Sequence, residues 1–240
     1  MNDVGKDAYA RYVTTKIGHV AGYDEKSYAA FARTYAWYLR GWLPPARSAR
    51  ILDAGCGHGN LLYALRQWGY EHLDGVDLSE EQVQLARERF PDVVQGDALQ
   101  FLASGNRAYD LIAALDVIEH LPLDKATEFL ELCRQAMTPG GRLIMQTPNA
   151  AGLRAGVVVC GDITHERVYA PSAMLQLLLL AGFERVEFRE TGPVPRGVVS
   201  CLRYVLWQAL RGGLKMWDYV ETGRSVPVYT RNMLVTALRG

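Results

Sequence analysis

The sequence predicts an α/β fold built on a doubly wound, Rossmann-like sheet, and three observations predict it. Strand-like and helix-like segments alternate between residues 50 and 147. A glycine cluster at residues 55–59 directly follows the first strand-like segment, and Asp77 and Asp97 lie at the ends of the next two. Alternation of this kind implies right-handed crossovers between parallel strands, which bring the carboxyl ends of the strands to one edge of the sheet.

Each element follows from hydrophobic spacing and from residues that start or end helices. Aromatic residues at helical spacing predict an N-terminal helix that Pro44-Pro45 ends, and Ser79 is expected to cap a helix that starts with two glutamates. Two late strands suggest an antiparallel edge. The predicted helices are 23–43, 61–68, one from Ser79, 124–137 and 171–180, and the predicted strands are 50–54, 73–77, 93–94, 109–115, 142–147, 184–189 and 228–238.

Length and composition fit one globular domain. The chain has 240 residues, 49% of them apolar and 22% charged, and its net charge is zero, which argues against nucleic acid as a partner. Monomer and dimer both stay open. We expect a single domain over residues 1–240, divided into an N-terminal helical cap or lid (1–45), a cofactor-binding core (46–147), substrate-side loops with a helical insertion (148–227) and the last strand (228–240).

Four scattered cysteines, Cys56, Cys133, Cys160 and Cys201, show no CxxC spacing and no clustering with histidine. This pattern predicts reduced thiols rather than disulfides or a zinc site. The N-terminal residues contain no apolar signal core, and no apolar run approaches the length of a membrane span. We therefore expect a cytoplasmic protein.

The glycine cluster is the strongest functional signal, because glycine lets the backbone approach a ligand closely. A dinucleotide-binding turn has GxGxxG and a phosphate loop has GKS or GKT, whereas here the third glycine comes one position early and Asn60 follows it. The loop therefore suits a ligand without phosphate, such as S-adenosylmethionine. Asp77 would accept the ribose hydroxyls and Asp97 the adenine amino group, although either carboxylate alone also fits a cap or a turn.

Together these segments resemble the class I S-adenosylmethionine-dependent methyltransferases. The resemblance covers roughly residues 43–188 and rests on ILDAGCGHGN, GVDLS, QGDA, YDLIAALDVIEHL and TPGGRLIMQTPN. It implies a seven-stranded sheet with the last strand antiparallel, S-adenosylmethionine as methyl donor and S-adenosylhomocysteine as product. It also implies cofactor contacts from Asp53, Gly55, Cys56, Gly57, Asn60, Asp77, Leu78, Asp97, Ala98, Leu115 and Asp116.

Two segments bear on the acceptor. Residues 116–120, DVIEH, are similar to those of small-molecule O-methyltransferases, including enzymes of quinone biosynthesis and of sugar decoration. Residues 161–167, with Tyr169 and Pro171, resemble methyltransferases of bacterial surface-glycan synthesis. The favoured acceptor is therefore a small molecule or a sugar of a glycan or glycolipid precursor, and a quinone or natural product is the alternative.

His165 and His120 are the candidate catalytic residues. In-line methyl transfer depends mostly on positioning, but a hydroxyl acceptor must also lose its proton, and an imidazole oriented by Asp162 or Glu166 could take it. His120 also fits a cofactor contact, and His165 a hydrogen bond that orders a loop. A divalent cation on Asp162, His165 and Glu166 matches no ligand spacing, so no metal is expected.

Two helical segments outside the core have more than one interpretation. Residues 202–217 carry apolar residues at helical spacing but are interrupted by Gly212-Gly213. They would either cover the sheet or the active site, or lie at a membrane interface beside a lipid-linked acceptor. The N-terminal helix, with Tyr12 and Arg33 nearby, would either close over the cofactor as a lid or pack into the core.

Three other functions stay open. A nicotinamide-dependent oxidoreductase is disfavoured by the glycine spacing and by Asp97. A non-catalytic S-adenosylmethionine-binding subunit fits the same residues, and only turnover separates it from an enzyme. An RNA methyltransferase is disfavoured by the neutral charge and by the lack of a separate basic domain.

Overall fold

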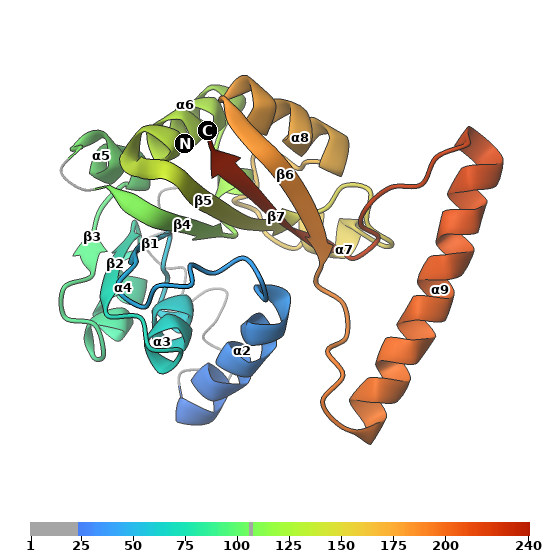
Figure 1. Cartoon of the computed structure of the whole chain (residues 1–240), viewed down its shortest axis with the longest axis horizontal. Coiled ribbons are helices and arrows are strands. Elements are labelled where there is room, and N and C mark those ends of the chain that lie inside the picture. Colours follow the sequence, from blue (N-terminus) through green and yellow to red (C-terminus); the bar gives the residue numbers. More distant parts are fainter. Residues whose placement is uncertain (1–23, 106–107) are drawn as a thin grey trace.

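The computed structural model describes residues 24–105 and 108–240. Within these residues, one sheet of seven strands crosses the molecule in the order β3-β2-β1-β4-β5-β7-β6 (Figure 1). The strands are β1 Arg50–Ala54, β2 His72–Asp77, β3 Val94–Gln95, β4 Tyr109–Leu115, β5 Met137–Pro148, β6 Phe183–Glu190 and β7 Asn232–Arg239. The predicted α/β class and the predicted number of strands are confirmed.

The last strand is antiparallel, as expected, but it does not lie at an edge. β7 pairs antiparallel with β5 on one side and with β6 on the other. The two late strands therefore form the antiparallel edge that the sequence predicts, with β6 outermost and running in the same direction as β5. Residues 233–237 of β7 are all buried, whereas most of β6 is partly exposed. Continuous burial is typical of a strand that is covered on both faces and flanked on both sides.

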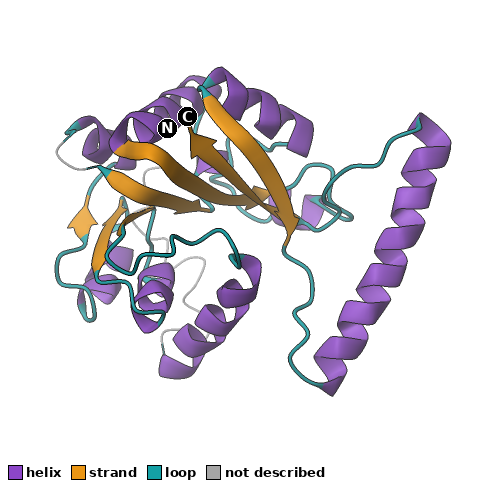
Figure 2. Cartoon of the chain, in the orientation of Figure 1, coloured by secondary structure: helices purple, strands orange, loops and turns teal. Residues whose placement is uncertain are grey.

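Helices cover both faces of this sheet (Figure 2). They are α2 Glu25–Tyr38, α3 Asn60–Gln67, α4 Glu80–Arg87, α5 Ala98–Ala103, the 3₁₀ helix η2 Ile118–His120, α6 Leu123–Ala136, α7 Gly156–Val159, α8 Pro171–Leu180 and α9 Val198–Thr222. Ile51 of β1 shares a core with α2 and α3, and its neighbour Leu52 shares another with α6 and α8. Since neighbouring strand residues point to opposite faces, the sheet is doubly wound.

Two strands begin several residues away from the start that the sequence predicts. β5 begins before the predicted strand 142–147 and runs through residues 139–141, where its register with β4 shifts. The last strand begins at residue 232 rather than 228. The carbonyl oxygens of Val228 and Thr230 accept hydrogen bonds from Nδ2 of Asn149, at 3.0 Å each. A side chain rather than a neighbouring strand therefore satisfies this backbone.

The helical insertion before the last strand is the single helix α9. It continues across Gly212-Gly213, where the sequence predicted an interruption. No residue of α9 is buried against the described part of the chain, but Nε1 of Trp207 donates to Oε2 of Glu190, at the end of β6, at 2.9 Å. Figure 1 shows most of the helix standing away from the sheet. A cover of the sheet or the active site by α9 stays a prediction. No helix within residues 24–105 and 108–240 is long and apolar enough to cross a membrane.

Candidate active site

A cavity of about 680 Å³ lies at the carboxyl ends of β1, β2 and β4. All of the residues predicted to bind the cofactor line it, and so does His120. Phe31, Tyr35 and Gln82 also line the cavity, and the sequence did not predict this. The spacing of residues along a helix indicates which side of the helix is buried, but not what that side faces. The predicted residues that line the cavity are Asp53, Gly55, Cys56, Gly57, Asn60, Asp77, Leu78, Asp97, Ala98, Leu115 and Asp116.

The glycine loop leaves β1 with a backbone that suits only glycine. Gly55, Gly57 and Gly59 have φ angles of +78°, +52° and +89°, in the left-handed region where a side chain is strained. A Cβ added at Gly55 would also overlap the side chain of Val117. The loop thus exposes bare backbone to the cavity beside the end of β4.

Two carboxyl groups lie at the base of this loop. Asp53 is buried, and its burial, followed by the charge of Asp77, raises its pKa to about 8. Asp77 accepts hydrogen bonds from the backbone N–H of Gly57 at 2.8 Å and of Ser79 at 2.9 Å. Burial raises the pKa of Asp77, and these two hydrogen bonds oppose that increase. Carboxyl groups that ionise with difficulty favour a cationic group of a ligand beside them.

Asp97 caps α5 as well as lining the cavity. Its Oδ1 accepts from the backbone N–H of Leu99 at 2.7 Å and of Gln100 at 3.3 Å. The capping role that the sequence left open is therefore present. The other predicted cap, Ser79, also accepts from its helix, through the backbone N–H of Gln82.

A hydrogen-bond chain ties α2 to the end of β4. The Tyr35 hydroxyl donates to Oε1 of Gln146 at 2.8 Å, and Nε2 of Gln146 donates to both carboxylate oxygens of Asp116 at 2.9 and 3.1 Å. Asp116 has a φ of +57°, which is uncommon for a residue with a side chain and is found at functional sites. These hydrogen bonds hold α2 at the cavity. A lid role for this helix stays a prediction, and Tyr12, proposed beside it, lies outside the described residues.

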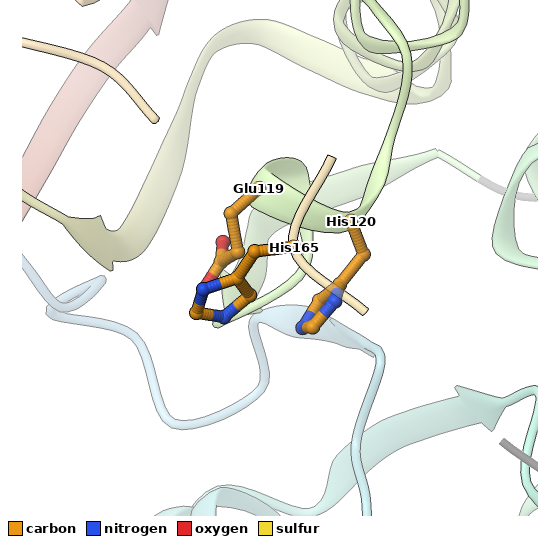
Figure 3. A group of neighbouring side chains, drawn as sticks. All are labelled: Glu119, His120 and His165. Atoms are coloured by element: carbon orange, nitrogen blue, oxygen red, sulfur yellow. The ribbon is translucent and has the colours of Figure 1, made fainter. Parts of the chain in front are cut away.

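The two candidate histidines lie side by side (Figure 3). Their ring centroids are 4.9 Å apart, although they come from η2 and from the loop before α8. Of the pair, only His120 is among the residues of the described chain that line the cavity. The loop is held to η2 because the backbone N–H groups of Glu166 and Arg167 donate to the carbonyl oxygen of Glu119, at 2.8 and 3.0 Å.

Asp162 and Glu166, which were predicted to orient an imidazole, make different contacts. Oδ2 of Asp162 is 4.0 Å from Nε2 of His165, too far for a hydrogen bond, while its Oδ1 accepts from the Thr164 hydroxyl at 2.6 Å. Glu166 is joined to the site through its backbone N–H. Sequence reasoning did not include Glu119, which is buried next to His165 (Figure 3).

Comparison with known sequences places the chain in a family. A sequence model of a protein family, described as a methyltransferase domain, matches residues 23–188. A ubiquinone biosynthesis O-methyltransferase from Idiomarina loihiensis is 30% identical over 154 residues. That match covers 57% of this chain and 62% of the relative, so it spans less than two thirds of the relative's length.

Solved structures share the fold. A SAM-dependent methyltransferase from Archaeoglobus fulgidus is 21% identical, with a TM-score of 0.66 over 95% of this chain and 99% of that chain. A magnesium protoporphyrin IX methyltransferase from Synechocystis with bound SAH is 18% identical, with a TM-score of 0.56 over 100% of this chain and 95% of that chain. Because the family model spans more than half of the sequence, this chain belongs to the methyltransferase domain family, as a class I S-adenosylmethionine-dependent methyltransferase.

Proposed function

We propose that the enzyme transfers the methyl group of S-adenosylmethionine to a hydroxyl of a small aromatic acceptor of the hydroxylated-quinone type. The observation that carries the proposal is the single cavity that joins the glycine loop and three strand-end carboxylates to His120. The printed name of the Idiomarina relative supports a quinone-type acceptor. The sugar acceptor favoured by the sequence has less support.

The cavity suits each part of the cofactor. The bare backbone at Gly55 and Gly57 would contact the methionine end, and Asp53 would face its ammonium group. Asp77 would accept the ribose hydroxyls. The adenine would lie by Asp97 and Ala98, and the sulfonium by Leu115 and Asp116, while Cys56, Asn60 and Leu78 complete the walls.

Aromatic side chains favour a flat acceptor. Phe31 and Tyr35 of α2 line the cavity and stack on one another, with ring centroids 3.9 Å apart and ring planes inclined by 13°. Leu121 and Pro122, which follow η2, add apolar wall. An apolar pocket with a few placed polar groups is typical of small-molecule sites.

His120 is the group in the cavity that we assign to proton removal. Its Nδ1 is 3.1 Å from both the carbonyl oxygen and the hydroxyl oxygen of Thr164. The hydroxyl donates its hydrogen to Asp162 at 2.6 Å, so both oxygens accept from Nδ1, and Nε2 has the lone pair. The acceptor oxygen attacks the methyl carbon, the carbon–sulfur bond breaks with its electron pair on sulfur, and the hydroxyl proton passes to Nε2. A phenol ionises near pH ~10, as tyrosine does, and is therefore a better partner for an imidazole than a sugar hydroxyl.

Methyl transfer to defined acceptors tests the proposal. Purified enzyme with isotopically labelled S-adenosylmethionine is expected to label a catechol that carries an apolar chain, and not a sugar nucleotide. Label in the sugar alone would restore the glycan interpretation. Binding of S-adenosylmethionine with no transfer to either would favour a non-catalytic subunit.

A contact of α9 with a membrane surface stays a prediction. Exposed apolar side chains on this helix, such as Leu202, Leu206 and Trp217, suit an interfacial helix that reaches a lipid-like acceptor. The methyl-transfer assay run in the presence of liposomes, followed by flotation of the liposomes, tests this membrane contact. Protein that stays entirely in the bottom fraction would exclude the contact.

Cofactor binding is expected to release a proton from Asp53. With its pKa near 8, the Asp53 carboxyl is mostly neutral at pH 7 in the free protein, and an ammonium group beside it would favour the carboxylate. Calorimetric titration at pH 7 in buffers of different ionisation enthalpy should therefore show release of roughly one proton. The Asp53→Asn variant should release none and bind more weakly.

The same shift predicts how stability depends on pH. The folded pKa of Asp53 lies above the ordinary value of 3.8, so the folded chain binds more protons than the unfolded chain between these values. The free energy of unfolding should fall as pH rises from about 4 to about 8, and less steeply in Asp53→Asn. Asp92→Asn, at an exposed site, is the control. If Asp53→Asn released as many protons on cofactor binding as the wild type does, Asp53 would not be the group that loses the proton.

A further inference from the structure

We propose that Glu119, His120 and His165 form a binding site for one divalent transition-metal cation at the acceptor end of the cavity. One ligand atom from each residue lies within 4.8 Å of the other two. Figure 3 shows the carboxylate and both rings gathered on one side of η2, with His165 brought there by the loop before α8. The binding site itself does not depend on the proposed function.

Both imidazoles are oriented as metal ligands usually are. Nδ1 of His165 is 3.0 Å from the carbonyl oxygen of Val159, and Nδ1 of His120 is 3.1 Å from that of Thr164. A carbonyl oxygen only accepts, and the Thr164 hydroxyl, which is also 3.1 Å from Nδ1 of His120, donates its own hydrogen to Asp162. Each Nδ1 therefore carries the hydrogen, and each Nε2 presents a lone pair. A hydrogen bond from the second ring nitrogen to a carbonyl is the arrangement that holds metal-binding histidines in place.

The charge around the rings also favours a cation. Glu119 is 1% exposed, and the side chains of His165 and Asp162 are 8% and 5% exposed. Oδ2 of Asp162 lies 4.0 Å from Nε2 of His165 and is within reach as a fourth ligand. Two buried carboxyl groups next to two imidazoles lose their desolvation cost when a divalent cation sits between them.

The ligand types select the class of metal. Two imidazole nitrogens and one or two carboxylates suit Zn²⁺, Mn²⁺ or Fe²⁺, whereas Mg²⁺ and Ca²⁺ prefer oxygen ligands. Bonds of about 2.0–2.1 Å to such a metal would draw the three ligand atoms closer together than they lie in the free site. The expectation of no metal came from the spacing of Asp162, His165 and Glu166, which omits the ligands supplied by η2.

The position of His120 suggests what the cation would do, and this role rests on the proposed function. His120 lines the cavity, so a cation on its Nε2 would lie next to an acceptor hydroxyl. Coordination would lower the pKa of that hydroxyl, and its proton would leave to water. Nε2 of His120 cannot bind the cation and take the proton at once, so the two routes exclude one another.

Metal titration of the whole chain tests the site. Protein treated with chelator and dialysed is titrated with Mn²⁺, followed by electron paramagnetic resonance, and with Zn²⁺, followed by calorimetry. We expect one equivalent to bind, and His165→Ala to weaken binding by at least about 100-fold, because losing a ligand should cost at least as much as the roughly 10–100-fold that losing a hydrogen-bond partner of a ligand costs. Glu119→Gln preserves the shape of the side chain, so a similar loss there would not be a failure to fold. His72→Ala, at an exposed histidine on β2, should bind as wild type does.

The outcomes separate the site from the function. Wild-type protein that binds Mn²⁺ and Zn²⁺ no better than His165→Ala would overturn the site, even if methyl transfer is robust. One equivalent bound with transfer unchanged by chelator would support the site and leave His120 as the proton acceptor. One equivalent bound with transfer abolished by chelator and restored by metal would support both the site and its role.

Discussion

Asp77→Ala is expected to weaken the binding of S-adenosylmethionine by at least about 100-fold. The carboxylate would accept the two ribose hydroxyls, and a hydrogen bond to a charged group contributes about 1.5–3 kcal/mol. It also accepts from the backbone N–H of Gly57 and of Ser79, so it joins the glycine loop to the start of α4. Its loss removes the ligand contacts and releases the loop together. Calorimetric titration with S-adenosylmethionine and S-adenosylhomocysteine measures the effect.

Two matched variants interpret that result. Asp77→Asn retains one oxygen acceptor, and its binding should fall between that of wild type and Asp77→Ala. Asp92→Ala removes an exposed carboxylate from the turn between α4 and β3 and should leave binding unchanged. If Asp77→Ala bound the cofactor within about threefold of wild type, Asp77 would not hold the ribose.

Gly55→Ala is expected to lower the free energy of unfolding by about 2–4 kcal/mol and to abolish cofactor binding. A residue other than glycine in the left-handed region costs about 1–2 kcal/mol. Gly55 has a φ of +78°, and its added Cβ would overlap Val117, which adds the cost of overpacking. Because both residues line the cavity, any shift that relieves the overlap moves a cavity wall. Denaturant unfolding and calorimetry measure the two effects.

Gly41→Ala separates the cost of the backbone strain from the cost of the overlap with Val117. Gly41 has a nearly equal φ of +76°, but a Cβ there would meet nothing within 4 Å, so only the backbone strain remains. The Gly55→Ala/Val117→Ala double variant removes the overlap instead and should regain part of the stability relative to Val117→Ala. If Gly41→Ala and Gly55→Ala lowered the free energy of unfolding equally, and Gly55→Ala still bound the cofactor, the overlap with Val117 would have no role.

The cavity at the strand ends could be predicted from the sequence because its residues lie at the ends of strands. Gly55, Asp77 and Asp97 each lie at or just beyond the carboxyl end of a parallel strand, and right-handed crossovers bring those ends to one edge of the sheet. The distances along the chain are short, and each turn is determined by local chemistry. The order of the strands up to β5 was predictable for the same reason.

The cluster of Glu119, His120 and His165 could not be predicted in this way. Glu119 and His120 meet His165 across more than forty residues, because backbone hydrogen bonds hold that loop to η2. Gln146 lies between Tyr35 and Asp116 through contacts that no spacing indicates. A hydrophobic pattern identifies which face of an element is buried, but not the element that covers it.

The sequence by itself determined the fold class, the methyltransferase family and the residues that line the cavity at the strand ends. Tertiary structure alone decided that β7 lies between β5 and β6, that no residue of α9 is buried, and that two histidines and a glutamate meet beside the cavity. The physical reason is the range of the interactions involved. Turn chemistry and strand-end positions act over a few residues, whereas strand neighbours and side-chain clusters depend on the packing of the whole chain.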